Sequence, residues 1–414
     1  MSLRSARSAT GTCLDLASFT WLRSPPGQAA LADLAARPLA QADVLRELER
    51  LRRTLTPEQA GAALELALLR RRARAKFPAA DQLFFTREAL EQASAAPVAA
   101  HRAARLAGDH GGRRYSHIAD LGCGVGGDAL ALAAAGARVS AVERDELRLA
   151  MARANAEALG LEQRIAFLQR DLLVEPPPLA DALFCDPGRR AGGRRRFSVE
   201  AYEPPLSHVL RWRDQTPALA AKLAPGVDPA ELPADAELEF VSLDGELKEA
   251  ALWCGPLALV RRRATLLTAA GEHWELASAT LTRVLCPLSP PLAYLYEPDP
   301  AVIRAGLVTD LAARLGAAQL DPQIAYLTAD TLMLTPFARA WPMLSWQPFG
   351  LKALRAALRA LDVGPVTVKK RGSPLDTDAL ARQLSGAGQR PLVVVLTQVA
   401  GRPAMLICDP PVRS

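Results

Sequence analysis

Four glycines and an aspartate stand close together in the stretch IADLGCGVGG, which begins at Ile118. Asp120 lies in an apolar run just before the glycines, and an alanine-rich segment follows them. Glycine allows a backbone to approach a ligand closely, and the start of a helix offers free N–H groups. The stretch therefore predicts a strand, a tight turn and a helix that together bind a cofactor.

Two cofactor codes fit these glycines. Gly122, Gly124 and Gly127 match the G-x-G-x-x-G pattern of dinucleotide sites. Asp120 with Gly122, Gly124 and Gly126 matches D-x-G-x-G-x-G, the turn that binds S-adenosylmethionine (SAM). The glycines alone do not choose between the two codes, and a turn without a ligand is a third interpretation.

Acidic residues after the neighbouring strands favour the SAM code. The carboxylate of Asp120 could meet the ammonium group of SAM, whereas it would repel a pyrophosphate. Glu143 ends the second predicted strand, where a carboxylate can accept two ribose hydroxyls under either code. Asp171 ends the third strand, close to where an adenine would lie. Asp186 and Pro187 end the fourth, at the carboxyl edge where open α/β sheets carry out chemistry.

These residues lie within an alternation of strands and helices that predicts a parallel sheet with helices on both faces. Residues before about 110 are predicted to be helical, and a Pro-rich segment at 286–300 begins an α+β module with one helix over 300–316. In the core a short helix is expected over 245–253, and the last two strands form an antiparallel hairpin. The predicted core strands are 117–124, 138–145, 164–171, 180–187, 236–243, 258–268 and 273–281.

With its closing hairpin, the whole stretch 115–285 resembles a class I SAM-dependent methyltransferase. The resemblance implies an α/β fold with a Rossmann-like, seven-stranded core and SAM bound across the glycine turn. The residues that match the family's cofactor-binding positions are Asp120, Gly122, Gly124, Gly126, Glu143 and Asp171. Asp186 and Pro187 match the start of the fourth motif, D/N-P-P-Y/F in amino-methylating members. There the acid or amide and the next carbonyl accept hydrogen bonds from the target amine.

The fourth motif departs from that pattern, because it reads DPGRR. Gly188 replaces the second proline and Arg189 replaces the aromatic residue, so no ring is available there to stack on a flipped base. Arg189 and Arg190 could bind an anionic substrate such as a phosphate backbone, or they could pair with acids of the same domain. The departure also leaves open a SAM-binding protein without catalysis.

The flanking segments resemble a bacterial group of methyltransferases with a C-terminal module similar to the RNA-binding THUMP domain. The stretches that carry this resemblance are FFTREALEQAS, DPGRR, YLYEPDPAVIRAG, and VKKRGSP followed by LVVVLTQVAGRPAMLIC. The resemblance implies a helical domain over 1–112, the methyltransferase domain over 113–290, a ferredoxin-like linker over 291–340 and a THUMP-like, RNA-binding domain over 341–414.

A basic turn ends a predicted strand of this last module. Lys369, Lys370 and Arg371 are suited to phosphate contacts there. A loop that only adds solubility is the other interpretation. Aromatic residues are few, so recognition of a folded RNA by its shape and backbone fits better than a platform for single strands.

Composition narrows the class of protein. The chain has 414 residues and a net charge of +6, largely from clustered arginines that could neutralise phosphates. Its six cysteines contain no C-x-x-C pair, which argues against a zinc site or a disulfide framework and fits a reducing, cytoplasmic location. No window is apolar enough to suggest a membrane span. Metal-dependent chemistry has no visible ligand set.

The sequence thus predicts an enzyme that uses SAM to methylate RNA (tRNA or rRNA), at a base nitrogen. Asp186 and Pro187 are the candidate catalytic residues, and Asp186 would orient the target amine. The candidate substrate-binding residues are Arg189, Arg190, Lys369, Lys370 and Arg371. The alternatives are an RNA-binding protein with a SAM fold and little transferase activity, a methyltransferase for a protein or an anionic small molecule, and an oxidoreductase.

Overall fold

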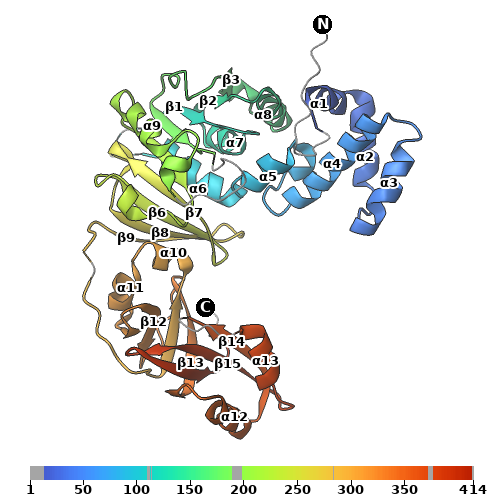
Figure 1. The fold of residues 1–414 in the computed structure, drawn as a ribbon. Helices are drawn as coiled ribbons and strands as arrows, with labels where there is room; N and C mark the ends of the chain where they lie inside the picture. The colour runs from blue at the N-terminus through green and yellow to red at the C-terminus, as the bar shows by residue number, and fades with distance from the viewer. Residues whose placement is uncertain are drawn as a thin grey trace. The chain divides into compact units, whose positions relative to one another are not determined.

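The computed structural model covers residues 1–414 and describes residues 14–109, 112, 114–188, 198–282, 284–371 and 376–412. The chain divides into two compact units, which are described in turn. The first holds residues 1–236 and 251–258, and the second holds residues 237–250 and 259–414. Figure 1 labels the elements.

Regular secondary structure runs through both units. The α-helices of the described residues are α1 (Leu16–Arg23), α2 (Pro25–Ala35), α3 (Val44–Leu51), α4 (Pro57–Ala73), α5 (Arg87–Gln92), α6 (Ala96–Ala107), α7 (Gly127–Ala134), α8 (Glu146–Ala158), α9 (Leu206–Arg211), α10 (Pro300–Arg304), α11 (Val308–Leu315), α12 (Leu351–Ala360) and α13 (Thr377–Leu384). The strands are β1 (His117–Leu121), β2 (Arg138–Glu143), β3 (Ile165–Gln169), β4 (Ala182–Cys185), β5 (Leu219–Leu223), β6 (Glu237–Leu243), β7 (Glu246–Cys254), β8 (Arg262–Leu267), β9 (His273–Ser278), β10 (Tyr294–Pro298), β11 (Ala318–Asp321), β12 (Ile324–Ala329), β13 (Ala338–Pro348), β14 (Val363–Lys370), β15 (Arg390–Val399) and β16 (Arg402–Cys408).

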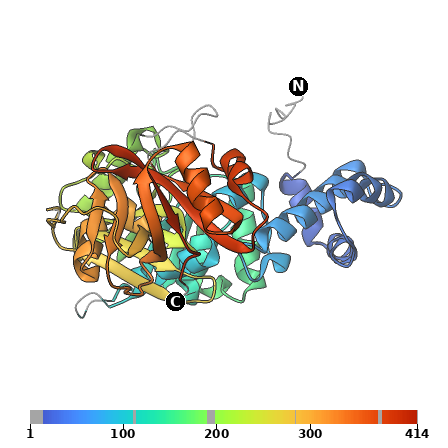
Figure 2. The same ribbon diagram turned by 90° about the horizontal axis from the view of Figure 1, so that it is seen from below.

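The N-terminal helices α1–α4 form a bundle, drawn in blue in Figures 1 and 2. Helix α4 begins with a reciprocal cap: the Gln59 amide donates to Thr56 Oγ1 (3.3 Å) and the Thr56 amide donates to Gln59 Oε1 (3.2 Å). The core of the bundle also takes in Met151 and Ala154 of α8. The predicted helical N-terminal region is therefore confirmed, and it packs against a helix of the α/β core.

The core of the first unit is a parallel sheet. Its strand order is β3-β2-β1-β4-β5, followed by β7. Strand β1 pairs in parallel with β2, where Leu121 faces Val142, and with β4, where Leu121 faces Cys185. Since parallel strands end at one edge of a sheet, this register brings the glycine turn, the end of β2 and the end of β4 together. The predicted Rossmann-like α/β class is confirmed.

Two strands of this sheet were not predicted from the sequence, so the described residues form more core strands than the seven expected. The segment 245–253 was expected to be a short helix, but residues 246–253 belong to strand β7, in which Glu249 to Cys254 are all buried. Strand β5 was not anticipated, because its sequence LAAKL is rich in residues that favour helices. Both segments are strands because pairing within a buried sheet outweighs their local preference.

In the second unit, the strand order continues from the first half of β7 through β6 and β8 to β9. Strands β8 and β9 are antiparallel, so the predicted closing hairpin is confirmed. The other sheet of this unit has the order β11-β12-β10-β13-β16-β15-β14. The single helix expected over 300–316 is instead two helices, α10 and α11, because Gly306 adopts a left-handed backbone (φ +68°) between them.

Strand β15 explains how this second sheet is covered. Leu392, Val394 and Leu396 pack with α12 and α13, which lie beside the strands in Figure 1, whereas Val393 and Val395 pack with residues of β10–β13. Successive side chains of a strand point to opposite faces, so a strand buried on both sides has no polar alternation.

Among the described residues, no helix has the length and apolar character needed to cross a membrane.

Candidate functional site

The glycine turn joins β1 to α7, and its backbone separates the two cofactor codes. Gly122, Gly124 and Gly126 have left-handed φ angles of +87°, +56° and +92°. A side chain at Gly126 would also lie 3.2 Å from the Cβ atom of Ala152 in α8. Gly127 is an ordinary first residue of α7, and a Cβ there would meet nothing closer than 3.9 Å. The required glycines are therefore those of the D-x-G-x-G-x-G code.

Asp120, on β1 before the turn, is fully buried, and neither carboxylate oxygen has a hydrogen-bond partner among the described residues. Burial, and then the nearby carboxylates of Asp128 and Asp186, raise its pKa well above the ordinary value; Arg102 and the amide of Ala129 lower the pKa, but by less. A buried carboxylate without a partner is costly. The turn therefore holds a buried acid whose ionised form a cationic ligand group would stabilise.

The neighbouring acid Asp128 does not share this property. Arg102, which is 2% exposed, donates from Nε to Asp128 Oδ1 at 3.1 Å and forms an ion pair with it through a second nitrogen. Asp128 therefore has a cationic partner within the protein, and Asp120 has none of this kind.

Glu143, the last residue of β2, is buried and holds the turn in place. Its Oε2 accepts the amide of Gly124 (3.0 Å), and its Oε1 accepts the amides of Arg144 and Asp145 (2.9 Å each). An ionised carboxylate has about four acceptor positions, so one of them stays available for a hydroxyl group. This contact with the backbone of the glycine turn was not evident from the sequence.

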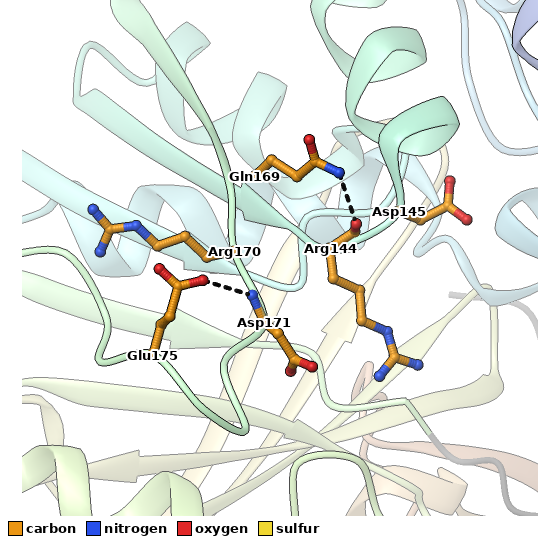
Figure 3. Close-up of a pocket in the computed structure, with 6 residues that line it drawn as sticks. All are labelled: Arg144, Asp145, Gln169, Arg170, Asp171 and Glu175. Atoms are coloured by element: carbon orange, nitrogen blue, oxygen red, sulfur yellow. Dashed lines mark hydrogen bonds between the residues drawn. The ribbon is translucent and has the colours of Figure 1, made fainter.

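A polar hollow of about 550 Å³ lies beside the ends of β2 and β3 (Figure 3). Its lining residues are Arg144, Asp145, Gln169, Arg170, Asp171 and Glu175. The Asp171 amide donates to Glu175 Oε1 at 3.4 Å, and Gln169 Nε2 donates to the Arg144 carbonyl at 3.3 Å. The hollow is large enough for a small ligand. It places Asp171 next to the loop that follows Glu143.

Asp186 lies directly after β4, at the same sheet edge. Its amide donates to the Leu121 carbonyl at 3.4 Å, and its own carbonyl would be 3.3 Å from a side chain at Gly122. The Asp186 carboxylate is one quarter exposed (25%) and accepts a hydrogen bond from Lys222 Nζ at 2.6 Å. Lys222, on the unpredicted strand β5, is a residue of this site that the sequence analysis missed; its one signal was a lysine within an apolar run.

The end of the D-P-G motif is held by residues further along the chain. Pro187 is buried, and Gly188 exchanges two backbone hydrogen bonds with Glu203 (2.9 and 2.8 Å). The Glu203 carboxylate forms an ion pair with Arg144, which lines the hollow. Arg189 and Arg190 lie outside the described residues.

The basic residues of β14 lie in the second unit. Lys369 and Arg371 both pair with Glu297 of β10, Arg371 at 3.7 Å, and Lys369 Nζ also lies 4.9 Å from the centre of the Trp341 ring. Lys370, between them, is exposed. Lys369 and Arg371 share the single carboxylate of Glu297, so these two cations keep a net positive charge.

The structure thus places Asp120, Glu143 and Asp186 around a glycine turn at the carboxyl edge of a parallel sheet, and Asp171 in the hollow at the ends of β2 and β3. An unpartnered buried acid beside that turn fits the ammonium group of SAM. The class that this fold and site define is the SAM-dependent methyltransferases.

Comparison with known proteins supports that class. Family models match residues 118–185 (methyltransferase domain), 338–410 (THUMP domain-like) and 15–73 (a domain of unknown function). Uncharacterised SAM-dependent methyltransferases from two strains of Mycobacterium tuberculosis are 40% identical over 348 residues, or 81% of this chain and 92% of theirs. The chain therefore belongs to the SAM-dependent methyltransferases, with SAM as its cofactor.

A solved structure agrees with the fold. A protein from Porphyromonas gingivalis W83, assigned as a methyltransferase, superposes with a TM-score of 0.70 over 90% of this chain and 99% of its own, at 21% identity. The similarity therefore extends over most of the chain and is not confined to the α/β core.

Proposed function

We propose that this enzyme methylates a base nitrogen of structured RNA, such as a tRNA or rRNA, with Asp186 orienting the target amine. The observation that carries the proposal is the position of Asp186: a partly exposed carboxylate beside the glycine turn, next to the unpartnered Asp120. The THUMP-like match at 338–410 supports RNA as the substrate.

The residues around the turn would hold the cofactor. Asp120 would pair with the ammonium group of SAM, and this pairing would offset the cost of its burial. Glu143 would accept ribose hydroxyls with its remaining acceptor position, and Asp171 would lie near the adenine in the polar hollow. Gly122, Gly124 and Gly126 would let the backbone approach the ligand.

Bound SAM supplies a methyl group on a sulfonium. In the transfer this methyl group would go to the target nitrogen, and the electron pair of the broken carbon–sulfur bond would stay on sulfur. Asp186 and the carbonyl of Pro187 would accept hydrogen bonds from the amine, so that its lone pair points towards the methyl group. The excess proton then leaves the methylated nitrogen to water. Such positioning supplies much of the acceleration in a displacement reaction.

The basic residues would bind the RNA backbone. Lys369, Lys370 and Arg371 would contact phosphates, since Lys369 and Arg371 share one carboxylate, that of Glu297, and keep a net positive charge. Arg189 and Arg190, next to the target-binding motif, would contact a phosphate near the reacting base.

Transfer of labelled methyl groups tests this function. The purified enzyme is incubated with methyl-labelled SAM and either total RNA or a protein extract, both from cells that lack the gene. We expect label in the RNA that ribonuclease releases and protease does not. Label in the protein extract alone would contradict an RNA substrate. If neither the RNA nor the protein extract is labelled, both an RNA substrate and a protein substrate are contradicted.

A further inference from the structure

Lys222 is a lysine within a sheet, on a strand whose five residues are all buried. Its side chain is 5% exposed. A buried ammonium group is costly unless it is paired and hydrogen-bonded. Its position therefore requires partners at the end of its side chain.

The partners of Lys222 lie at the site. Its Nζ donates to Asp186 Oδ2 at 2.6 Å and to the carbonyl of Gln92, the last residue of α5, at 3.2 Å. A charge-assisted hydrogen bond of that length fixes the donor and the acceptor strongly. One oxygen of Asp186 is therefore committed to Lys222, and the other is the oxygen left for a substrate.

The charges around the turn can be paired off. Asp128 has Arg102, Asp186 has Lys222, and Asp120 has no cation of its own. Each pair is neutral, so Asp120 is the acid of this group that lacks a cationic partner. Without Lys222, Asp186 would be a second uncompensated carboxylate beside the place where the cationic cofactor binds.

We propose that Lys222 is a positioning residue of the transfer reaction: it neutralises Asp186 and fixes which of its oxygens accepts the target amine. This role rests on the proposed function of Asp186. Lys222 need not touch the substrate, because it acts through the carboxylate to which it is bonded.

The affinity for SAM tests the neutralising role without any RNA. Lys222→Met leaves the Asp186 carboxylate without its cation, so it should tighten the binding of the cationic SAM about five- to tenfold. Asp186→Asn leaves the Lys222 ammonium group without its carboxylate, so it should weaken SAM binding by a similar factor. The double variant should return to within about twofold of the wild-type dissociation constant. Isothermal titration calorimetry measures all four proteins.

Single-turnover transfer to RNA tests the orienting role. Family members with Asn at this position predict an active Asp186→Asn enzyme. In this protein Lys222 would donate to the side-chain oxygen of the asparagine, so its NH₂ group would face the target amine. Both of these groups are hydrogen-bond donors, so no hydrogen bond could form between them. Asp186→Asn should therefore be about a hundredfold slower than wild type, and adding Lys222→Met should restore part of the rate because the amide can then turn. Lys222→Arg, which keeps the donor, should stay faster than Lys222→Met.

Lys248→Met is the matched control. Lys248 pairs with Glu246 at the same 2.6 Å, but this pair is exposed, so neither SAM affinity nor transfer should change. The proposal is overturned if, in thermally stable proteins, Lys222→Met does not tighten SAM binding or Asp186→Asn does not weaken it. If the wild-type enzyme labels no RNA, the proposed function is contradicted instead. The four SAM dissociation constants would still show whether Lys222 neutralises Asp186.

Discussion

Replacing Asp186 by alanine is expected to slow methyl transfer by about a hundredfold or more, while the dissociation constant for SAM rises less than tenfold. The alanine variant lacks the oxygen that accepts the hydrogen bond of the target amine, so the lone pair is no longer directed at the methyl group. Cofactor binding depends mainly on Asp120, Glu143 and the glycine turn, which the substitution leaves in place. Single-turnover kinetics and calorimetry separate the two effects.

Asp81→Ala is a suitable control for this experiment. Asp81 also forms an ion pair, with Arg74 at 3.0 Å, but both side chains are exposed and lie in the segment that follows helix α4. An exposed pair contributes little to stability, so this variant should transfer methyl groups at the wild-type rate. If Asp186→Ala retained the wild-type transfer rate, Asp186 would not orient the target.

Replacing Asp120 by asparagine is expected to weaken SAM binding by roughly 30- to 100-fold, because it removes the carboxylate that would pair with the ammonium group. At neutral pH and without SAM, the free energy of unfolding of this variant should be higher than that of the wild type. The pKa of Asp120 is raised in the folded protein, chiefly by burial, so the folded state holds this proton more tightly than the unfolded state. The free energy of unfolding of the wild type therefore falls as the pH rises above 3.8, and the asparagine variant lacks this loss.

The raised pKa of Asp120 also couples SAM binding to protons. The ammonium group favours the ionised carboxylate, so binding should release a proton and the affinity should rise with pH until Asp120 is ionised in the free protein. Calorimetry in two buffers of different ionisation enthalpy measures the released proton. Asp120→Asn should show no such release, and an equal release from both proteins would contradict the assignment.

Much of this site could be predicted from the sequence, because it follows from strand order. Asp120, Glu143 and Asp186 come at or just beyond the ends of apolar strands, and neighbouring parallel strands end at one sheet edge. Asp171 could be placed by the same reasoning. The departure DPGRR could be read from the residues, although its arginines lie outside the described structure.

Contacts between distant segments could not be predicted. Lys222 lies on a strand whose alanines and lysine favour a helix in isolation, and only its place in the buried sheet makes it the partner of Asp186. In the same way, the bond between Glu203 and Gly188, and the pairing of Lys369 with Glu297, join residues that no local pattern connects.

The most direct test of the central claim is mass spectrometry of modified nucleosides in total RNA from a strain that lacks the gene. We expect one methylated nucleoside to disappear, to return when the wild-type gene is restored, and not to return with Asp186→Ala. Loss of that nucleoside would also identify the methylated base. An unchanged set of methylated nucleosides in every RNA fraction would contradict a role in RNA methylation.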